Sequence, residues 1–165
     1  MTNQLNFKSL AEALEVIDSS VIIDNRVENS VVFLLQRLDL EERWLGVEAL
    51  LTNSRPKVRV LGLRVVRRNF REQVLLEKVI QLSFSVDRLA ELQYWYTAIL
   101  SRYSVTRFGR ELCKEMESRA DTDFSARHIR ALEMHQAKGS KAKKIVLGRL
   151  RGLAIERGWI EMRNT

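Results

Sequence analysis

The sequence contains few of the residues that make turns and cross-links. Its 165 residues include one proline, seven glycines and a single cysteine, Cys113. A β-sandwich or β-barrel needs turn residues every ~8–12 positions, and this chain has too few of them. A lone cysteine cannot form a disulfide within the chain and does not suffice for a cysteine-based metal site. We therefore expect a protein of the reducing cytoplasm, with no cofactor and no metal.

Long apolar stretches are also missing. None approaches the ~18–20 residues that span a bilayer, and the first 18 residues contain neither a basic leader nor an apolar run of the signal-peptide type. The hydrophobic content of 45% is ordinary for a soluble globular protein. We therefore expect a soluble, intracellular single domain that has no membrane partner and is long enough to bury a sizeable core.

Positive charge is in excess and is unevenly placed. Residues 1–54 hold four Lys or Arg and nine Asp or Glu, a net of −5, whereas residues 55–165 hold 24 and 12, a net of +12, which together give +7. Such an asymmetry indicates that one end meets an anionic partner. Two alternatives remain: arginine is simply a good helix former, or the two ends meet head to tail in a homo-oligomer.

Apolar residues recur with helical spacing along the chain and predict an all-α fold of about nine short helices. Leu10, Leu14 and Ile17 mark the first of them. Asn53 and Ser54 are candidates to cap a helix whose first turn contains Pro56, where the missing N–H of proline does no harm. The expected helices cover residues 26–38, 40–51, 56–69, 72–85 and 85–103, then one from Ser104 or Thr106, one around 129–134 and one over 140–158, with a polar loop at 118–125.

An internal repeat supports a solenoid. Residues 44–55 align with residues 60–71, so that Gly46 matches Gly62 and Arg55 matches Arg71. One helix plus one turn, repeated, is typical of an α-solenoid, in which neighbouring units stack to build a continuous core. The two matched glycines would let adjacent helices approach closely. We expect a solenoid body over residues 1–120 and a basic helical cap over residues 121–165.

Residues 53–66, NSRPKVRVLGLRVV, are similar to the first-helix pattern of HEAT-type repeats. In that pattern a polar turn leads into a proline, here Pro56, then a Val-Arg pair, here Val58 and Arg59, and then a small residue, here Gly62. The resemblance is good over this stretch and diffuse from residue 26 to residue 119. It implies a HEAT-like helical-hairpin solenoid that serves as a binding scaffold, in which Arg59 braces a neighbouring turn.

The same stretch carries a concentration of cations. At 100° per residue, five of them fall within an arc of roughly 100°, opposite an apolar side that includes Val58, Val65 and Val66. We call them the basic ridge: Lys57, Arg64, Arg67, Arg68 and Arg71. Because like charges at this spacing repel, either acids from preceding helices neutralise the ridge or it binds phosphates or an acidic protein surface. The candidate acids are Asp39, Glu41, Glu42 and Glu48.

A second basic region lies near the C-terminus, where residues 125–165 hold ten Lys or Arg and three acids. We call five of these cations the C-terminal cluster: Lys141, Lys143, Lys144, Arg149 and Arg151. Lysines at a helix start oppose the helix dipole, which indicates an anionic partner or a neighbouring carboxylate. The region is also similar to the end of a winged helix-turn-helix, in which a recognition helix runs into a short strand. The positions that carry this resemblance are Gly139, Lys141, Lys144, Arg149, Arg151, Gly158 and Trp159.

Catalytic patterns are missing, since we find no glycine-rich phosphate loop, no paired catalytic carboxylates and no triad. His128 and His135 are seven residues apart, a spacing that favours surface or helix–helix contacts over a metal site. Cys113 lies beside arginines that could lower its pKa, but a partly buried, unreactive cysteine is the simpler interpretation. The one enzymatic alternative is a HEAT-type DNA glycosylase, with Trp44 beside acidic residues as the candidate group.

The sequence therefore predicts a non-catalytic binding module and not an enzyme. The leading hypothesis is that the basic ridge and the C-terminal cluster contact the backbone of a nucleic acid, DNA or RNA. The alternative is a protein–protein interaction adaptor, or a small chaperone or assembly factor, that binds an acidic or helical segment of another protein.

Overall fold

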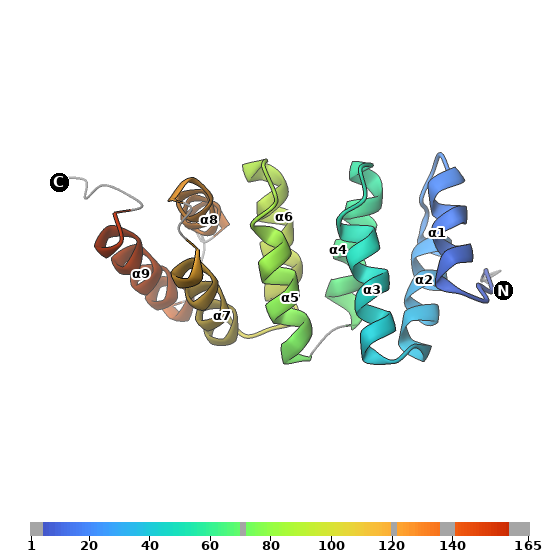
Figure 1. Cartoon of the computed structure of the whole chain (residues 1–165), viewed down its shortest axis with the longest axis horizontal. Helices are drawn as coiled ribbons and strands as arrows, with labels where there is room; N and C mark the ends of the chain where they lie inside the picture. The colour runs from blue at the N-terminus through green and yellow to red at the C-terminus, as the bar shows by residue number, and fades with distance from the viewer. Residues whose placement is uncertain (1–4, 70–71, 120–121, 136–140, 159–165) are drawn as a thin grey trace. The chain divides into compact units, whose positions relative to one another are not determined.

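The computed structural model describes residues 5–69, 72–119, 122–135 and 141–158. These residues form nine α-helices and no strand (Figure 1), so the predicted all-α fold class is confirmed. The helices belong to two compact units, residues 1–70 and residues 71–165, which we call unit 1 and unit 2. The division into a body over residues 1–120 and a cap over residues 121–165 stays a prediction. No helix in the described part of the chain is long and apolar enough to cross a membrane.

Unit 1 consists of two helical hairpins: α1 (Leu10–Ser19), α2 (Asn25–Arg37), α3 (Leu40–Leu51) and α4 (Pro56–Asn69). The first three helices begin at polar caps, because the side chains of Ser9, Asp24 and Asp39 each accept a hydrogen bond from a backbone N–H in the first turn. α2 packs against α1, α3 and α4, and α3 packs against α4. Leu35 and Leu61 are among the fully buried side chains that these contacts create.

Unit 2 consists of five helices: α5 (Gln73–Ser83), α6 (Leu89–Leu100), α7 (Val105–Ser118), α8 (Thr122–His135) and α9 (Lys141–Glu156). α7 packs against α5 and α9, and α6 packs against α8, so helices two apart in the sequence stack in two layers (Figure 1). This arrangement is compatible with a helical solenoid.

Two local predictions in unit 2 have different outcomes. Ser104 caps α7, as predicted, by accepting a hydrogen bond from the backbone N–H of Arg107 at 3.2 Å. The polar loop predicted for residues 118–125 is shorter than expected, because α8 already begins at Thr122. Short polar and acidic residues favour the first turn of a helix as much as they favour a loop, so composition alone did not place this boundary.

Gly62 lets α4 lie close against α3, as the internal repeat indicated. A Cβ atom added to Gly62 would lie 3.0 Å from Leu50 Cβ and 3.2 Å from the backbone nitrogen of Leu51, both closer than ordinary van der Waals contact. Gly46 is similarly close, since an added Cβ would lie 2.6 Å from Leu35 Cδ2. Gly148 of α9 differs, because an added Cβ would meet no atom within 4 Å.

These two environments predict opposite effects of the same substitution. Gly62→Ala should lower the free energy of unfolding by about 1–2 kcal/mol, because the overpacking strain outweighs the gain of ~1 kcal/mol in helix propensity. Gly148→Ala should raise it by up to ~1 kcal/mol, because only the propensity changes. Urea denaturation followed by far-UV circular dichroism measures both. Equal effects of the two substitutions would show that α3 and α4 accommodate the added methyl group without strain.

Candidate anionic-partner interface

The basic ridge lies on the exposed side of α4, opposite the side that α4 buries in unit 1. The cations Lys57, Arg64, Arg67 and Arg68 are all exposed. The apolar residues Val58, Leu61, Val65 and Val66 are at most 2% exposed. The exposed and buried residues predicted for this helix are therefore confirmed, although Leu61 lies about 40° around the helix from Lys57 and borders the ridge. The fifth member of the ridge, Arg71, lies outside the described residues.

Glu28 of α2 holds two of the ridge cations in place. Its carboxylate lies 3.5 Å from Nη1 of Arg64 and 3.4 Å from Nη1 of Arg68. Nη1 of Arg68 also donates a hydrogen bond to Oδ1 of Asn29 at 2.6 Å. Because Glu28 is only 9% exposed, one nearly buried carboxylate relieves the repulsion between two guanidinium groups. Glu28 is not among the acids that the sequence indicated for this role, which are Asp39, Glu41, Glu42 and Glu48.

Backbone carbonyl groups of unit 1 are bound by three further arginines: Arg43, Arg55 and Arg59. Arg43 donates to the carbonyls of Leu35 and Leu38 at the end of α2, at 3.0 and 3.1 Å. Arg59 donates to the carbonyls of Asn53 and Ser54, at 2.8 and 3.0 Å, and thereby braces the turn before its own helix. The structural role predicted for Arg59 is confirmed.

Arg55 makes the most extensive of these contacts. Its guanidinium donates to the carbonyls of Ile17, Asp18 and Ser20, at 2.8, 2.9 and 2.6 Å. These carbonyls lie at the C-terminal end of α1, where a helix leaves carbonyl groups without intrahelical partners and carries partial negative charge. Arg55 therefore ties the start of α4 to the end of α1.

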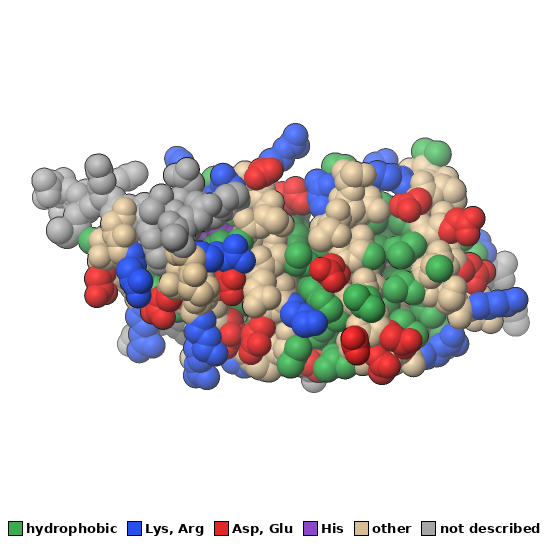
Figure 2. All heavy atoms as spheres, viewed as in Figure 1, with side chains coloured by type: hydrophobic (Ala, Val, Ile, Leu, Met, Phe, Trp, Pro, Cys, Tyr) green, Lys and Arg blue, Asp and Glu red, His purple; other side chains and the backbone are tan. Residues whose placement is uncertain are grey.

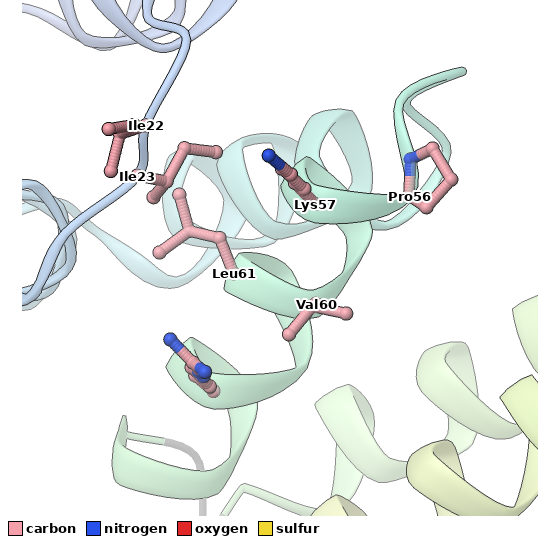
Figure 3. Close-up of a pocket in the computed structure, with 7 residues that line it drawn as sticks. Ile22, Ile23, Pro56, Lys57, Val60 and Leu61 are labelled. Atoms are coloured by element: carbon pink, nitrogen blue, oxygen red, sulfur yellow. The ribbon is translucent and has the colours of Figure 1, made fainter.

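A groove lies between α4 and the loop that joins α1 to α2, and we call it the α4 groove (Figure 3). Its volume is about 300 Å³, and its lining residues are Ile22, Ile23, Pro56, Lys57, Val60, Leu61 and Arg64. In Figure 3, Ile23 of the loop and Leu61 of α4 point toward one another, and Lys57 extends over the same space. The loop is exposed and apolar, since Val21 is 81% and Ile22 is 74% exposed. The α4 groove therefore combines an apolar lining with two cations.

Unit 1 presents other apolar side chains as well. Phe33, Leu40 and Leu45 of α2 and α3 are exposed, and Figure 2 shows hydrophobic side chains at the surface of this part of the molecule, interspersed with acidic ones. The guanidinium of Arg37 lies 5.0 Å from the centre of the Phe33 ring. Unit 1 therefore does not present a uniformly basic surface.

The C-terminal cluster belongs to unit 2 and is only partly described. Lys144, Arg149 and Arg151 are exposed on α9. Nε of Arg151 donates to Oε1 of Glu133 of α8 at 2.7 Å, so one cation of the cluster is already paired. At 100° per residue, Arg149 lies about 140° around the helix from Lys144, so these two do not share a face. The side chains of Lys141 and Lys143, together with Gly139 and the strand predicted from Trp159 onward, lie outside the described residues.

The remaining candidate groups have structural positions. His128 is 1% exposed and lies against Tyr96 of α6, a helix–helix contact as predicted. Burial raises the pKa of the Cys113 thiol, with a further rise from Glu117 and an opposing effect of Arg149, so the arginines do not activate it. Trp44, the aromatic of the glycosylase alternative, is 7% exposed in the core of unit 1. No group of three or more His, Cys, Asp or Glu in the described segments is placed to hold a metal ion.

These observations define an all-α protein, compatible with a helical solenoid, that carries a groove with apolar and cationic lining in unit 1. No family model matches the chain, and no curated protein or solved structure is significantly similar to it.

Proposed function

We propose that the protein is a non-catalytic interaction adaptor that binds an acidic segment of a partner protein through the exposed side of α4. The observation that carries this proposal is that the ridge cations Lys57 and Arg64 line a groove with exposed apolar side chains. A protein segment can offer both carboxylates and apolar side chains, whereas a nucleic acid backbone offers phosphates alone.

The charges of unit 1 also favour a protein over a nucleic acid on this surface. Residues 1–70 hold ten Lys or Arg and nine Asp or Glu, a net of +1. Arg43, Arg55 and Arg59 bind backbone carbonyls, and two ridge arginines share Glu28. Nucleic acid affinity grows with the number of phosphates that free cations neutralise, and few cations of unit 1 serve that purpose.

The similarity of residues 53–66 to a HEAT-type repeat supports the same class of function, because such repeats are binding scaffolds. The brace that Arg59 makes and the close helix approach at Gly62 agree with that resemblance. We accordingly propose a HEAT-like protein of the cytoplasm, with its partner site on the second helix pair of unit 1.

Nucleic acid, the leading hypothesis from the sequence, is here the second candidate partner, through unit 2. Residues 71–165 hold 18 Lys or Arg and 12 Asp or Glu, a net of +6. Lys144 and Arg149 are exposed on α9. Exposed cations in a unit of positive net charge are the feature that non-specific backbone binding requires.

A pair of charge reversals, one in each unit, separates the two candidates. The double variant Lys57→Glu/Arg67→Glu should weaken binding of a glutamate-rich peptide at least about tenfold, whereas the matched variant Lys144→Glu/Arg149→Glu should leave it within about twofold. Fluorescence anisotropy at low and high salt measures this binding, with single-stranded DNA as the second probe. Binding of the peptide should weaken as the salt concentration rises, because exposed charges are screened.

The opposite pattern would reject the proposal. If DNA binds and the Lys57→Glu/Arg67→Glu variant weakens it while no acidic peptide binds at low salt, then the α4 surface is a phosphate ridge. If only the α9 variant weakens DNA binding, the second candidate holds for unit 2. Circular dichroism of each variant verifies that the helices are intact.

A further inference from the structure

The α4 groove has a regular order of side chains along its helical wall. Lys57, Val60, Leu61 and Arg64 all line it, and they occupy positions i, i+3, i+4 and i+7 of α4. This spacing places four side chains on one stripe of an α-helix. The stripe therefore reads cation, apolar, apolar, cation over two turns. Leu61, at 2% exposure, lies at the floor of the groove, and Val60, at 39%, remains accessible to a partner.

The opposite wall supplies further apolar surface. It is the loop between α1 and α2, where Ile22 is 74% exposed and Ile23 points toward Leu61 (Figure 3). The groove volume of about 300 Å³ is roughly twice the ~150 Å³ of a cavity that holds a benzene ring. Two aliphatic side chains of a partner therefore fit between the loop and α4.

The two cations set the spacing of the charges that a partner must carry. Lys57 and Arg64 are seven residues apart, so their Cα atoms are separated by about 10.5 Å along the helix axis at 1.5 Å per residue. A partner helix lying along α4 has the same rise, so carboxylates at its positions i and i+7 reach both cations. Arg64 pairs with Glu28 through one guanidinium nitrogen at 3.5 Å and its side chain is 53% exposed, which leaves donors for a second carboxylate.

We propose that the α4 groove binds an acidic amphipathic helix of a partner protein, with carboxylates at positions i and i+7 and apolar side chains at i+3 and i+4. This inference rests on the proposed function, because it specifies which kind of acidic segment unit 1 binds. Charge complementarity selects an acidic helix and repels a basic one. The order of the partner side chains mirrors the stripe on α4, in the helix-in-groove mode of recognition.

Three groups of designed peptides provide the probes. The first is a fluorescent, alanine-rich helical peptide with Glu at i and i+7 and Leu at i+3 and i+4. The second has the same composition, with the two leucines moved to i+1 and i+5, which lie on another face of the helix. The third group consists of two peptides that each carry Lys in place of one of the two Glu residues. Binding to the full-length protein is followed by fluorescence anisotropy.

The in-register peptide should bind at least about tenfold more tightly than the peptide with moved leucines, because only the first buries its leucines in the groove. Val60→Asp should weaken its binding by a similar factor. The matched control is Val74→Asp, since Val74 is 47% exposed on α5 of unit 2 and does not line the groove. That control should leave binding unchanged.

A charge exchange tests the cation positions. Lys57→Glu should weaken binding of the in-register peptide about tenfold, and one of the two lysine-bearing peptides should recover most of this loss with the Lys57→Glu variant. The peptide that recovers binding also gives the direction of the partner helix along α4. A general loss of folding cannot produce such a recovery, so the exchange remains informative if a variant is destabilised.

The outcomes distinguish failure of this inference from failure of the proposed function. Equal binding of both leucine arrangements, with no effect of Val60→Asp, would overturn the helix-in-groove inference. If Lys57→Glu still weakens binding of the acidic peptides in that case, the proposed function is retained. If no acidic peptide binds at low salt, both are wrong. If single-stranded DNA displaces the peptide and binds the Val60→Asp variant as well as the native protein, the site takes a phosphate backbone and the inference is also overturned.

Discussion

Replacement of Arg55 by alanine should lower the free energy of unfolding by about 3 kcal/mol. The guanidinium of Arg55 donates to three carbonyls at the C-terminal end of α1, at 2.6–2.9 Å. A hydrogen bond from a charged donor is worth about 1.5–3 kcal/mol, and a cation at a helix C-terminus adds a favourable interaction with the dipole. Water reaches some of these carbonyls in the variant, so we expect about 3 kcal/mol rather than the sum of three bonds.

Two further variants show whether the carbonyl contacts carry this effect. Arg55→Lys keeps the charge but replaces the planar guanidinium by a single ammonium group. Its free energy of unfolding should therefore lie between those of the native protein and the Arg55→Ala variant. Lys57→Ala removes an exposed cation two residues away and should change the free energy of unfolding by less than about 0.5 kcal/mol. Urea denaturation followed by circular dichroism gives these values.

Hydrogen exchange locates the effect within the molecule. The amides of α1 in the Arg55→Ala variant should exchange faster than in the native protein, while those of α7 in unit 2 should keep their protection. If Arg55→Ala is as stable as Lys57→Ala, then the guanidinium contributes no net stabilisation at the end of α1 and the contact is incidental.

Arginine content alone therefore does not measure how well a helical protein binds anions. In unit 1, Arg43, Arg55 and Arg59 donate to backbone carbonyl groups at helix ends and turns. This role requires a long side chain with several donors, and it leaves little of the positive charge for a partner. The cations of the α4 groove differ, because they border exposed apolar side chains.

Local features of the fold were predictable from the sequence because their causes lie within a few residues. Pro56 begins α4, Ser104 caps α7, and the third helix covers residues 40–51 as predicted. Helical periodicity placed Val58 and Leu61 inward and Lys57 outward. These outcomes follow from backbone geometry and from the alternation of apolar and charged residues within one helix.

The contacts that define the candidate site were less predictable because they join distant segments. Glu28 pairs with Arg64 across 36 residues, and Arg55 reaches Ile17 across 38 residues. The resemblance to a HEAT-type repeat predicted the role of Arg59, but nothing near Arg55 in the sequence shows that its guanidinium binds carbonyls of a distant helix. The loop over residues 20–24 carries no signal for its role as a groove wall either, because that role depends on how α1 and α2 pack in the folded unit.

The largest expected effect of pH concerns His128 in unit 2. Its ring stacks on Phe84 with the ring centres 4.0 Å apart, and its Nδ1 forms a hydrogen bond with the hydroxyl of Tyr96. Burial lowers the pKa of His128 from 6.5 to about 3, opposed by the nearby backbone of Ser83 and assisted by two arginines. Those arginines are Arg127 on the same helix and Arg119 at the end of α7, whose guanidinium lies 4.5 Å from the Phe84 ring centre.

The folded protein should therefore lose stability as the pH falls below about 6.5. In this range the unfolded chain binds a proton at His128, whereas the folded chain binds it only near pH 3. The depressed pKa belongs to the folded state. The contribution of His128 to the free energy of unfolding is therefore complete above pH 6.5, and it declines by about 1.4 kcal/mol per pH unit below that value. From pH 7.5 to pH 5 the free energy of unfolding should fall by about 2 kcal/mol through this group.

His128→Gln isolates this contribution, because glutamine keeps a polar group beside Tyr96 but does not titrate. The variant should be less stable at pH 7.5, yet its free energy of unfolding should change by about 2 kcal/mol less than that of the native protein between pH 7.5 and pH 5. His128→Phe provides a second non-titrating variant if the glutamine does not fit.

An NMR titration of the folded protein measures the pKa of His128 directly, since the ring protons of His128 should not shift between pH 8 and pH 5. A midpoint near 6.5 would mean that water reaches the ring and that α6 and α8 do not seal it as the packing indicates.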